Sequence, residues 1–184
     1  MNKKIICIVV LVIIIFIIVG GILWLNRNKN ENKIEEYTPV EEITDEQYRQ
    51  TIVSLYFNSK ETNMLVPEAR SVDVKEITKE PYLKLVDLLI QGTKSEKLEN
   101  VIPEGTKVNS AKIKDNIVYV DLSKEFIENH KGGAEEESKT IYSIVNTLTQ
   151  LNEVDGIKII IDGEENKEFK DKYINFSNVF VRKD

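Results

Sequence analysis

The chain is 184 residues long and carries 31 acidic and 25 basic side chains, which gives a formal net charge of −6. Its first 33 residues hold five of the basic groups and one acid, so the remainder carries a net charge of −10. Proteins that neutralise nucleic-acid phosphates need clustered Lys and Arg, and no such cluster is present, so we expect no nucleic-acid partner.

The N-terminal part contains an uncharged apolar run from Ile5 to Leu25, IICIVVLVIIIFIIVGGILWL. As a helix this run would reach about 30 Å, which is one bilayer crossing. A cleaved signal peptide has a shorter apolar core of roughly 7–15 residues followed by a small-x-small site. Lipid attachment would need a Cys just after the run, but Cys7 precedes most of it. We therefore predict a retained transmembrane helix at 5–25 and a short cytoplasmic end at 1–4.

The orientation of this helix is not decided by charge, because basic residues flank it on both sides. With only four residues ahead of the span, the short basic end is expected to stay in the cytoplasm. We therefore predict a single-pass protein of the cell membrane with an extracytoplasmic C-terminal domain. Residues 26–49 are polar, with too few apolar side chains to fold alone, and are predicted to be a flexible linker.

Ordered structure is predicted to begin near Gln50. The segment TIVSLYF alternates and is rich in β-branched and aromatic residues, which predicts a strand that ends at Asn58-Ser59. Residues Met64 to Val74 are expected to be extended, but Pro67 lacks an amide donor and favours an edge or bulged strand.

A helix is predicted from Glu80 to Gln91, because Pro81 suits its first turn and Gly92 supplies a stop. A second helix is predicted from Glu135 to Leu151 on the basis of an apolar stripe at helical spacing. Its three consecutive Glu residues fall in the first turn and are interpreted as partners of the helix dipole.

Two further strand signals lie between and after these helices. The runs VNSAKI and IVYVDL flank Lys114-Asp115-Asn116, which predicts a β-hairpin over Val108 to Asp121. The nearly all-apolar run Ile157 to Ile161 ends at Asp162-Gly163 and is expected in the middle of a sheet.

Together these elements predict an α+β fold: a single domain with one mixed β-sheet and two main helices packed on one face. The domain is placed at residues 50–165, a length suited to one core. Residues 166–184 form a C-terminal extension that is polar at first, ends in apolar residues, and is a candidate edge strand.

Four motifs in chain order resemble the GerMN domain, the sporulation and spore germination domain, over about Thr51 to Glu165. They are Leu65-Val66-Pro67-Glu68, Ile102-Pro103-Glu104-Gly105-Thr106, Tyr119-Val120-Asp121-Leu122-Ser123 and Ile161-Asp162-Gly163. The resemblance implies a fold similar to ring-building motifs of secretion systems and a role outside the cytoplasmic membrane. The family's founding protein carries two domain copies and a lipid-modified Cys, whereas this chain has one copy and an apolar N-terminal run.

The family-motif residues are interpreted as structural or interaction residues rather than as a catalytic set. Gly105 and Gly163 suit turns, Pro67 and Pro103 suit extended entries, and Asp121 to Ser123 falls where a strand ends. The candidate site residues are Leu65, Pro67, Glu68, Pro103, Gly105, Asp121, Ser123, Asp162 and Gly163.

No catalytic residue, cofactor site or metal site is predicted. After the apolar run the chain offers His130 alone and no Cys, which excludes Cys–His catalysis and disfavours a zinc site. His130 is expected to be a solvated loop residue. The preferred function is an interaction module that assembles with itself or with envelope or sporulation proteins.

Two alternatives remain open. One is a two-carboxylate hydrolase of wall glycan, which would hold two carboxyl groups about 5–9.5 Å apart across a cleft. Its candidates are Glu68, Glu104, Asp121 and Glu125. The other is noncatalytic binding of peptidoglycan through tyrosines that stack on sugars, for which the candidates are Tyr56, Tyr82, Tyr119 and Tyr142.

Overall fold

The computed structural model describes residues 17–24 and 49–183 of the chain. Residues 17–24 are helical and belong to one unit, and residues 49–183 belong to a second, compact unit. Within these two ranges, none of the helices has both the length and the apolar character that a membrane crossing requires. The predicted span at 5–25 and the predicted linker at 26–49 lie largely outside the described residues, and both stay predictions.

The first sheet is antiparallel and consists of β1 (Gln50–Ser59), β2 (Leu65–Asp73) and β3 (Leu98–Glu99), in the order β2-β1-β3. Pro67 lies opposite Tyr56 in the β1–β2 pair, within a strand that forms the edge of its sheet. The predicted edge position of this proline-containing strand is therefore confirmed, since an edge strand tolerates a missing amide donor.

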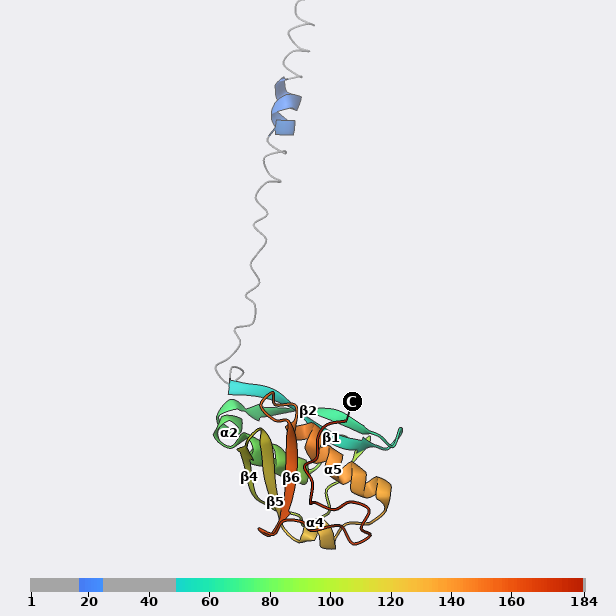
Figure 1. Ribbon diagram of the computed structural model, residues 1–184. Helices are drawn as coiled ribbons and strands as arrows, with labels where there is room; N and C mark the ends of the chain where they lie inside the picture. The colour runs from blue at the N-terminus through green and yellow to red at the C-terminus, as the bar shows by residue number, and fades with distance from the viewer. Residues whose placement is uncertain (1–16, 25–48, 184) are drawn as a thin grey trace, which may run out of the picture. The chain divides into compact units, whose positions relative to one another are not determined.

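The second sheet is mixed and consists of β4 (Val108–Lys114), β5 (Ile117–Leu122) and β6 (Gly156–Ile161). Strands β4 and β5 form the predicted hairpin, and Asp115 and Asn116 take φ values of 50° and 60°, as a two-residue hairpin turn requires. Strand β6 runs parallel to β5. The expectation of one sheet was wrong: the strands form two separate three-stranded sheets, and β1 and β2 lie across one end of β4, β5 and β6 (Figure 1).

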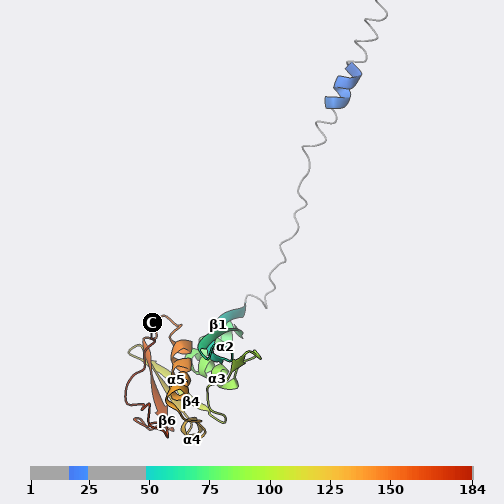
Figure 2. The same cartoon turned by 90° about the vertical axis from the view of Figure 1, so that its right-hand side faces the viewer.

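Both main helices are present, as α3 (Pro81–Gln91) and α5 (Ala134–Leu148). They contact each other and lie on the same face of the β4-β5-β6 sheet (Figures 1 and 2). Two short helices, α2 (Val74–Lys79) and α4 (Glu125–Glu128), were not predicted. The core between helices and sheets is one cluster that draws on all the longer elements, with fully buried side chains such as Leu55, Leu85, Val120, Ile144 and Phe176.

Polar side chains of α5 explain why the two sheets do not merge. Beyond its short pairing with β3, the second edge of β1 faces this helix. Thr147 Oγ1 accepts from the Tyr56 amide at 3.1 Å, and the Ser143 hydroxyl donates to the Tyr56 carbonyl at 2.5 Å. Two residues past the end of α5, the Gln150 side-chain amide bonds both the N–H and the C=O of Ser54. Because the helix satisfies these backbone groups, no further strand is needed there.

The C-terminal segment covers the outer edge of β6. Strand β6 was expected in the middle of a sheet, but it is the end strand of β4-β5-β6. Ile157 and Phe180 exchange two backbone hydrogen bonds of 2.8 Å. They form an isolated β-bridge, whereas residues 166–184 were a candidate for a full edge strand. Phe169 and Phe176 are at most 1% exposed and pack on Phe126 of α4. The C-terminal segment therefore covers β6, whose apolar sequence predicted a central strand.

Candidate functional site

The best-defined motif residue is Glu68, whose carboxylate fastens β2 to the turn after α3. Arg70 is 6% exposed and pairs with Glu68, and it also donates to the Gly92 carbonyl at 3.0 Å. The second carboxylate oxygen of Glu68 accepts from the Thr93 hydroxyl and from the Lys94 amide, the latter at 3.1 Å. Both oxygens of Glu68 therefore accept hydrogen bonds, and these bonds connect β2 to the turn after α3.

The electrostatics of Glu68 favour the ionised form. Burial alone would raise the pKa of this carboxyl, but the hydrogen bonds from Arg70, Thr93 and Lys94, together with the Arg70 charge, bring the pKa below its usual value. A general acid in glycoside hydrolysis needs a raised pKa. Glu68 is therefore suited to a structural ion pair and unsuited to donating a proton.

A second motif group closes the end of the β4-β5-β6 sheet. Asp121 Oδ1 accepts from the Gly163 amide at 3.1 Å, and Ser123 Oγ accepts from the Lys107 amide at 3.0 Å. Asp162 Oδ2 accepts from the Lys124 amide at 3.2 Å. Asp162 and Gly163 have φ values of 47° and 77° in a tight turn closed by hydrogen bonds between Ile161 and Glu164. These side chains tie three strand ends together.

The Pro103 motif forms a separate turn. The Pro103 carbonyl accepts from the Thr106 amide at 3.3 Å and from its hydroxyl at 2.7 Å. Gly105 takes φ 81° at the third position of this turn, where type II turns favour glycine. Glu104 is exposed, and Glu125 lies next to Gly105. Hydrogen bonding to Ser123 lowers the pKa of Glu125.

The four candidate acids of the hydrolase alternative do not share one cleft. Glu68 lines a small open hollow beside β2, whereas Glu104 lines a different, larger hollow of about 1030 Å³. Asp121 is engaged in the strand-end group described above. Neither of these two hollows has a tyrosine in its lining.

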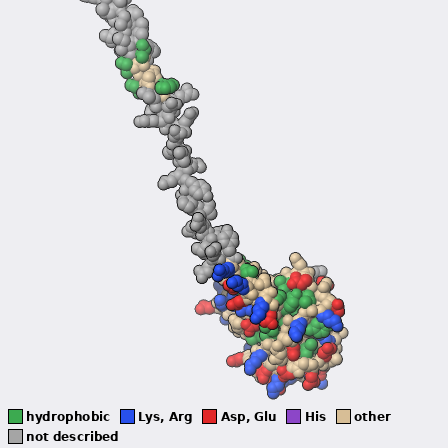
Figure 3. Space-filling view, turned by 90° about the vertical axis from the view of Figure 1, so that its left-hand side faces the viewer, with side chains coloured by type: hydrophobic (Ala, Val, Ile, Leu, Met, Phe, Trp, Pro, Cys, Tyr) green, Lys and Arg blue, Asp and Glu red, His purple; other side chains and the backbone are tan. Residues whose placement is uncertain are grey.

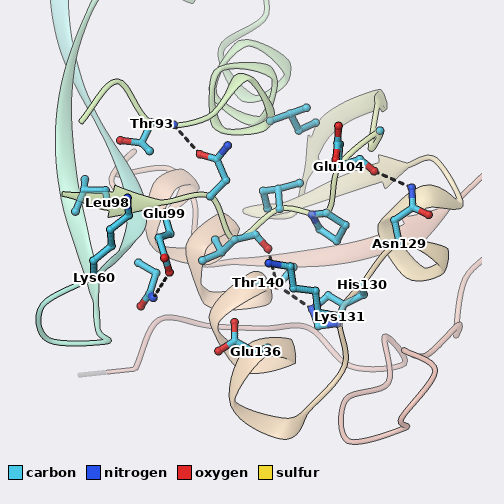
Figure 4. A pocket seen from close by; sticks show the side chains of 17 residues that line it. Lys60, Thr93, Leu98, Glu99, Glu104, Asn129, His130, Lys131, Glu136 and Thr140 are labelled. Atoms are coloured by element: carbon cyan, nitrogen blue, oxygen red, sulfur yellow. Dashed lines mark hydrogen bonds between the residues drawn. The ribbon is translucent and has the colours of Figure 1, made fainter. Parts of the chain in front are cut away.

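The larger hollow lies between the end of β1, strand β3, the loop that follows it, and α5 (Figure 4). Its sides carry both acids and bases: Lys60 and Glu99 lie on one side, and Glu104 and Lys131 on the other. Residues 17–24 and 49–183 contain no group of three or more His, Cys, Asp or Glu side chains placed to hold a metal ion.

His130 lines this hollow, and the expectation of a solvated loop residue was wrong. Its Nδ1 accepts from the Gly132 amide at 2.9 Å, and its Nε2 lies 3.0 Å from Thr140 Oγ1. The Thr140 hydroxyl donates to the Val101 carbonyl, so its oxygen accepts the hydrogen bond from Nε2–H. The ring also stacks on Phe169 at 4.3 Å between centroids. Burial lowers the pKa of His130, which favours the neutral imidazole.

Two buried charged residues on α5 escaped the sequence analysis. Lys139 is 7% exposed and binds Glu135, Glu136 and the Asn63 side chain at 2.7–3.0 Å. Burial would lower the pKa of Lys139, but its two Glu partners raise it overall. Glu137 is fully buried and accepts from the backbone amide of the C-terminal segment at Ile174, and burial raises its pKa. The three Glu residues in the first turn of α5 therefore differ. Glu135 and Glu136 are solvated partners of Lys139, whereas Glu137 is buried.

Polar spacing along α5 is the signal that would have identified the helix–strand contact. Thr140, Ser143 and Thr147 recur at helical intervals beside the apolar stripe of α5, and Gln150 continues this spacing two residues past the end of the helix. Each of them bonds backbone groups of another element. On the face in Figure 3, acidic and basic side chains are interspersed, with hydrophobic side chains exposed between them.

Comparison with known proteins gives a consistent result. A family model described as "Germane: Sporulation and spore germination" matches residues 54–167. The spore germination protein GerM of Bacillus subtilis (strain 168) is 38% identical over 104 residues. This match covers 54% of the present chain and 28% of GerM, so the chain corresponds to little more than a quarter of that relative.

Two solved structures are similar in fold and sequence. The first GerMN domain of the sporulation protein GerM from Bacillus subtilis has a TM-score of 0.60 and 28% identity, covering 73% of this chain and 99% of that domain. A putative lipoprotein from Clostridium perfringens has a TM-score of 0.51 and 28% identity, covering 73% of this chain and 89% of the lipoprotein. The α+β fold described above is thus shared with both.

Proposed function

The chain belongs to the Germane family of sporulation and spore germination, and on this premise we propose that its folded unit is a noncatalytic interaction module of the cell envelope. The module would assemble with itself or with envelope proteins during sporulation or germination. The observation that carries the proposal is the role of the motif acids. Glu68, Asp121 and Asp162 all accept hydrogen bonds from backbone amides and hold strand ends and turns in place.

The edge of the first sheet supports an interaction role. Among residues 49–183, β2 pairs with a strand on one side only. An open strand edge is suited to pairing with a strand of another molecule.

The placement in the envelope rests on the N-terminal run. Ile5 to Leu25 has the length and apolarity of a membrane anchor, and we propose that it holds the folded unit outside the cytoplasmic membrane. The similar Clostridium perfringens protein is described as a putative lipoprotein, which suits an anchored envelope protein. Protease added to intact cells should digest the folded unit. Protection until lysis would contradict this placement.

The test of the role is genetic. Deleting the gene from its native organism should reduce the number of heat-resistant spores or their germination, and a wild-type copy should restore it. Full-length protein, crosslinked in sporulating cells and purified through a tag, should carry an envelope protein or a second copy of itself. Normal spores from the deletion strain, or a strictly monomeric and partnerless protein, would contradict the proposal.

The hydrolase alternative has its own assay. Full-length protein in detergent would be incubated with purified peptidoglycan, and soluble fragments measured. We expect none, because Glu68 and Asp121 are engaged in holding the fold. Release of fragments that is lost in Glu68→Gln or in Asp121→Asn would overturn the noncatalytic assignment.

A further inference from the structure

The C-terminal segment adds a new outer edge to the β4-β5-β6 sheet, which we call the edge stretch (residues 179–181). Phe180 exchanges two backbone hydrogen bonds of 2.8 Å with Ile157, as directly opposed residues of an antiparallel pair do. Because both backbone groups of Phe180 face β6, those of Val179 and Val181 point away from it. Among the described residues, neither valine has a backbone hydrogen-bond partner.

The edge stretch is held in place from two sides. At Gly156, a Cβ atom would lie 2.8 Å from the Phe180 carbonyl oxygen, so the stretch packs against β6 at a position where only glycine leaves room for it. On its other side, Arg182 donates to the Tyr56 hydroxyl at 3.1 Å, and its guanidinium lies 5.7 Å from the centre of that ring. The outward-facing backbone groups are therefore presented in a fixed, extended conformation.

The edge stretch lacks the features that protect other strand edges in this fold. Sheet edges are commonly blunted by proline, by bulges or by charged side chains. Strand β2 contains Pro67, and β4 has an irregular register between Val108 and Ser110. The edge stretch has no proline and no charge, and its Val179 and Val181 side chains are 42% and 53% exposed. Exposed β-branched residues on an open edge favour pairing with another strand.

The sequence of the edge stretch indicates which strand pairs with it. An antiparallel partner reverses the chain direction, and the order Val179-Phe180-Val181 is the same in both directions. With Phe180 on a two-fold axis, Val179 lies opposite the partner's Val181, and the outward-facing backbone groups of the two residues match. The flanking Arg182 falls opposite the partner's Asn178, so no like charges meet.

We propose that the edge stretch pairs with the same stretch of a second copy of this chain, in an antiparallel arrangement about a two-fold axis at Phe180. Each of the two valine pairs then exchanges two backbone hydrogen bonds, and the β4-β5-β6 sheets of both copies become one continuous sheet. The contact is a property of this chain's C-terminal segment, because residues 179–181 lie beyond the 54–167 range that the family model matches.

Hydrogen exchange resolved to single amides tests this pairing in the full-length protein in detergent. In dilute protein the Phe180 amide should exchange slowly and the Val179 and Val181 amides fast. At concentrations where sedimentation velocity shows a dimer, both valine amides should exchange at least about tenfold more slowly. Association that leaves these amides fast, as contact through another surface would, or no association up to roughly 1 mM, would overturn the proposal.

A matched pair of double variants tests the same contact. Val179→Lys/Val181→Lys places like charges directly opposite each other across the two-fold axis and should weaken self-association at least about tenfold. Ile52→Lys/Met64→Lys adds the same charge at residues that are 75% and 66% exposed elsewhere, and it should leave self-association unchanged. Circular dichroism shows whether both variants are folded, and the exchange result on the wild-type protein decides the matter if one is not. Equal weakening in the two variants would assign the effect to general charge and overturn the proposal.

This pairing rests on the self-association that the proposed function includes, and the two can fail separately. Weakening by Ile52→Lys/Met64→Lys alone would move the contact to the first sheet, which overturns the pairing at residues 179–181 but keeps an assembling module. Recovery of an envelope protein by a chain that does not self-associate would have the same meaning. Normal spores from the deletion strain, together with protected valine amides, would instead contradict the proposed function and leave the pairing intact.

Discussion

Replacing Glu68 by Gln should destabilise the folded unit by about 3 kcal/mol, because it leaves the buried Arg70 charge without its counter-ion. The Arg70 and Glu68 side chains are 7% and 12% exposed, so water replaces little of the lost interaction. Breaking a buried pair by removing one partner costs roughly 3–5 kcal/mol, and the slight exposure of Glu68 places the effect at the lower end. Gln keeps one oxygen for the Thr93 or Lys94 donor, which limits further loss.

The assay is urea unfolding of the full-length protein in detergent at neutral pH, followed by circular dichroism. The matched control is Glu76→Gln, which breaks the ion pair with Lys84 at 2.7 Å. That pair is 58% exposed on the Glu side, so its loss should cost less than about 1 kcal/mol. The double variant Glu68→Gln/Arg70→Met removes both charges. Its loss of unfolding free energy should be clearly smaller than the sum of the losses of the two single variants.

The same pair predicts a pH dependence. The pKa of Glu68 is lower in the folded state than its usual 4.5, so the unfolded state binds more protons between the two values. The stabilisation is therefore complete above pH 4.5 and is lost as pH falls through the folded-state pKa. A Glu68→Gln cost no larger than that of Glu76→Gln would refute the structural role assigned to this carboxylate.

Four further changes are tested by the same unfolding measurement. Gly105→Ala should cost about 1–2 kcal/mol, because its φ of 81° is unfavourable for a side chain; no change would mean that the turn adopts another conformation. Phe176→Ala should cost about 3–5 kcal/mol, and a loss below about 1 kcal/mol would exclude the C-terminal segment from the core. Thr147→Val should cost about 1–3 kcal/mol by leaving the Tyr56 amide unpaired, and a neutral effect would contradict the helix–strand contact. Because the pKa of His130 is lowered from 6.5 by burial, stability should fall as pH drops below that value, and His130→Gln should remove this part of the slope; an unchanged slope would mean that another group titrates.

Local elements were predictable because local chemistry determines them. The hairpin turn at Asp115-Asn116 needs two residues that tolerate positive φ, and these residues are visible in the sequence. Pro81 and Gly92 bracket α3 as expected from their backbone preferences. Pro67 indicated an edge strand because it lacks an amide donor, and β2 is such a strand.

The arrangement of these elements was not predictable from the same rules. The order of strands and helices predicted a single sheet, whereas the edge of β1 is satisfied by Thr147 of α5 and by Gln150 just beyond that helix. The all-apolar β6 indicated a central strand, but Phe180 and the tail around it provide the cover. Glu137 and Lys139 resembled solvated helix residues, and only tertiary contacts reveal their burial.

The candidate site shows the same division. Turn-forming motif residues such as Gly105 and Gly163 were identifiable by residue type. The partners of the motif acids were not, because Thr93 and Lys94 bind Glu68 from the turn after α3, and Lys124 binds Asp162 from the loop after β5. The larger hollow was also missed, since it is assembled from five separate segments whose polar residues are individually unremarkable.

The central claim is that this protein serves sporulation or germination without carboxylate chemistry. Glu104 is exposed, and Glu125 accepts a hydrogen bond from Ser123 that Gln can also accept, so both can be changed to Gln with little effect on the fold. A deletion strain carrying the Glu104→Gln/Glu125→Gln double variant should form and germinate heat-resistant spores at the wild-type level. Failure of that variant to complement, with the protein present at normal amounts, would contradict the claim.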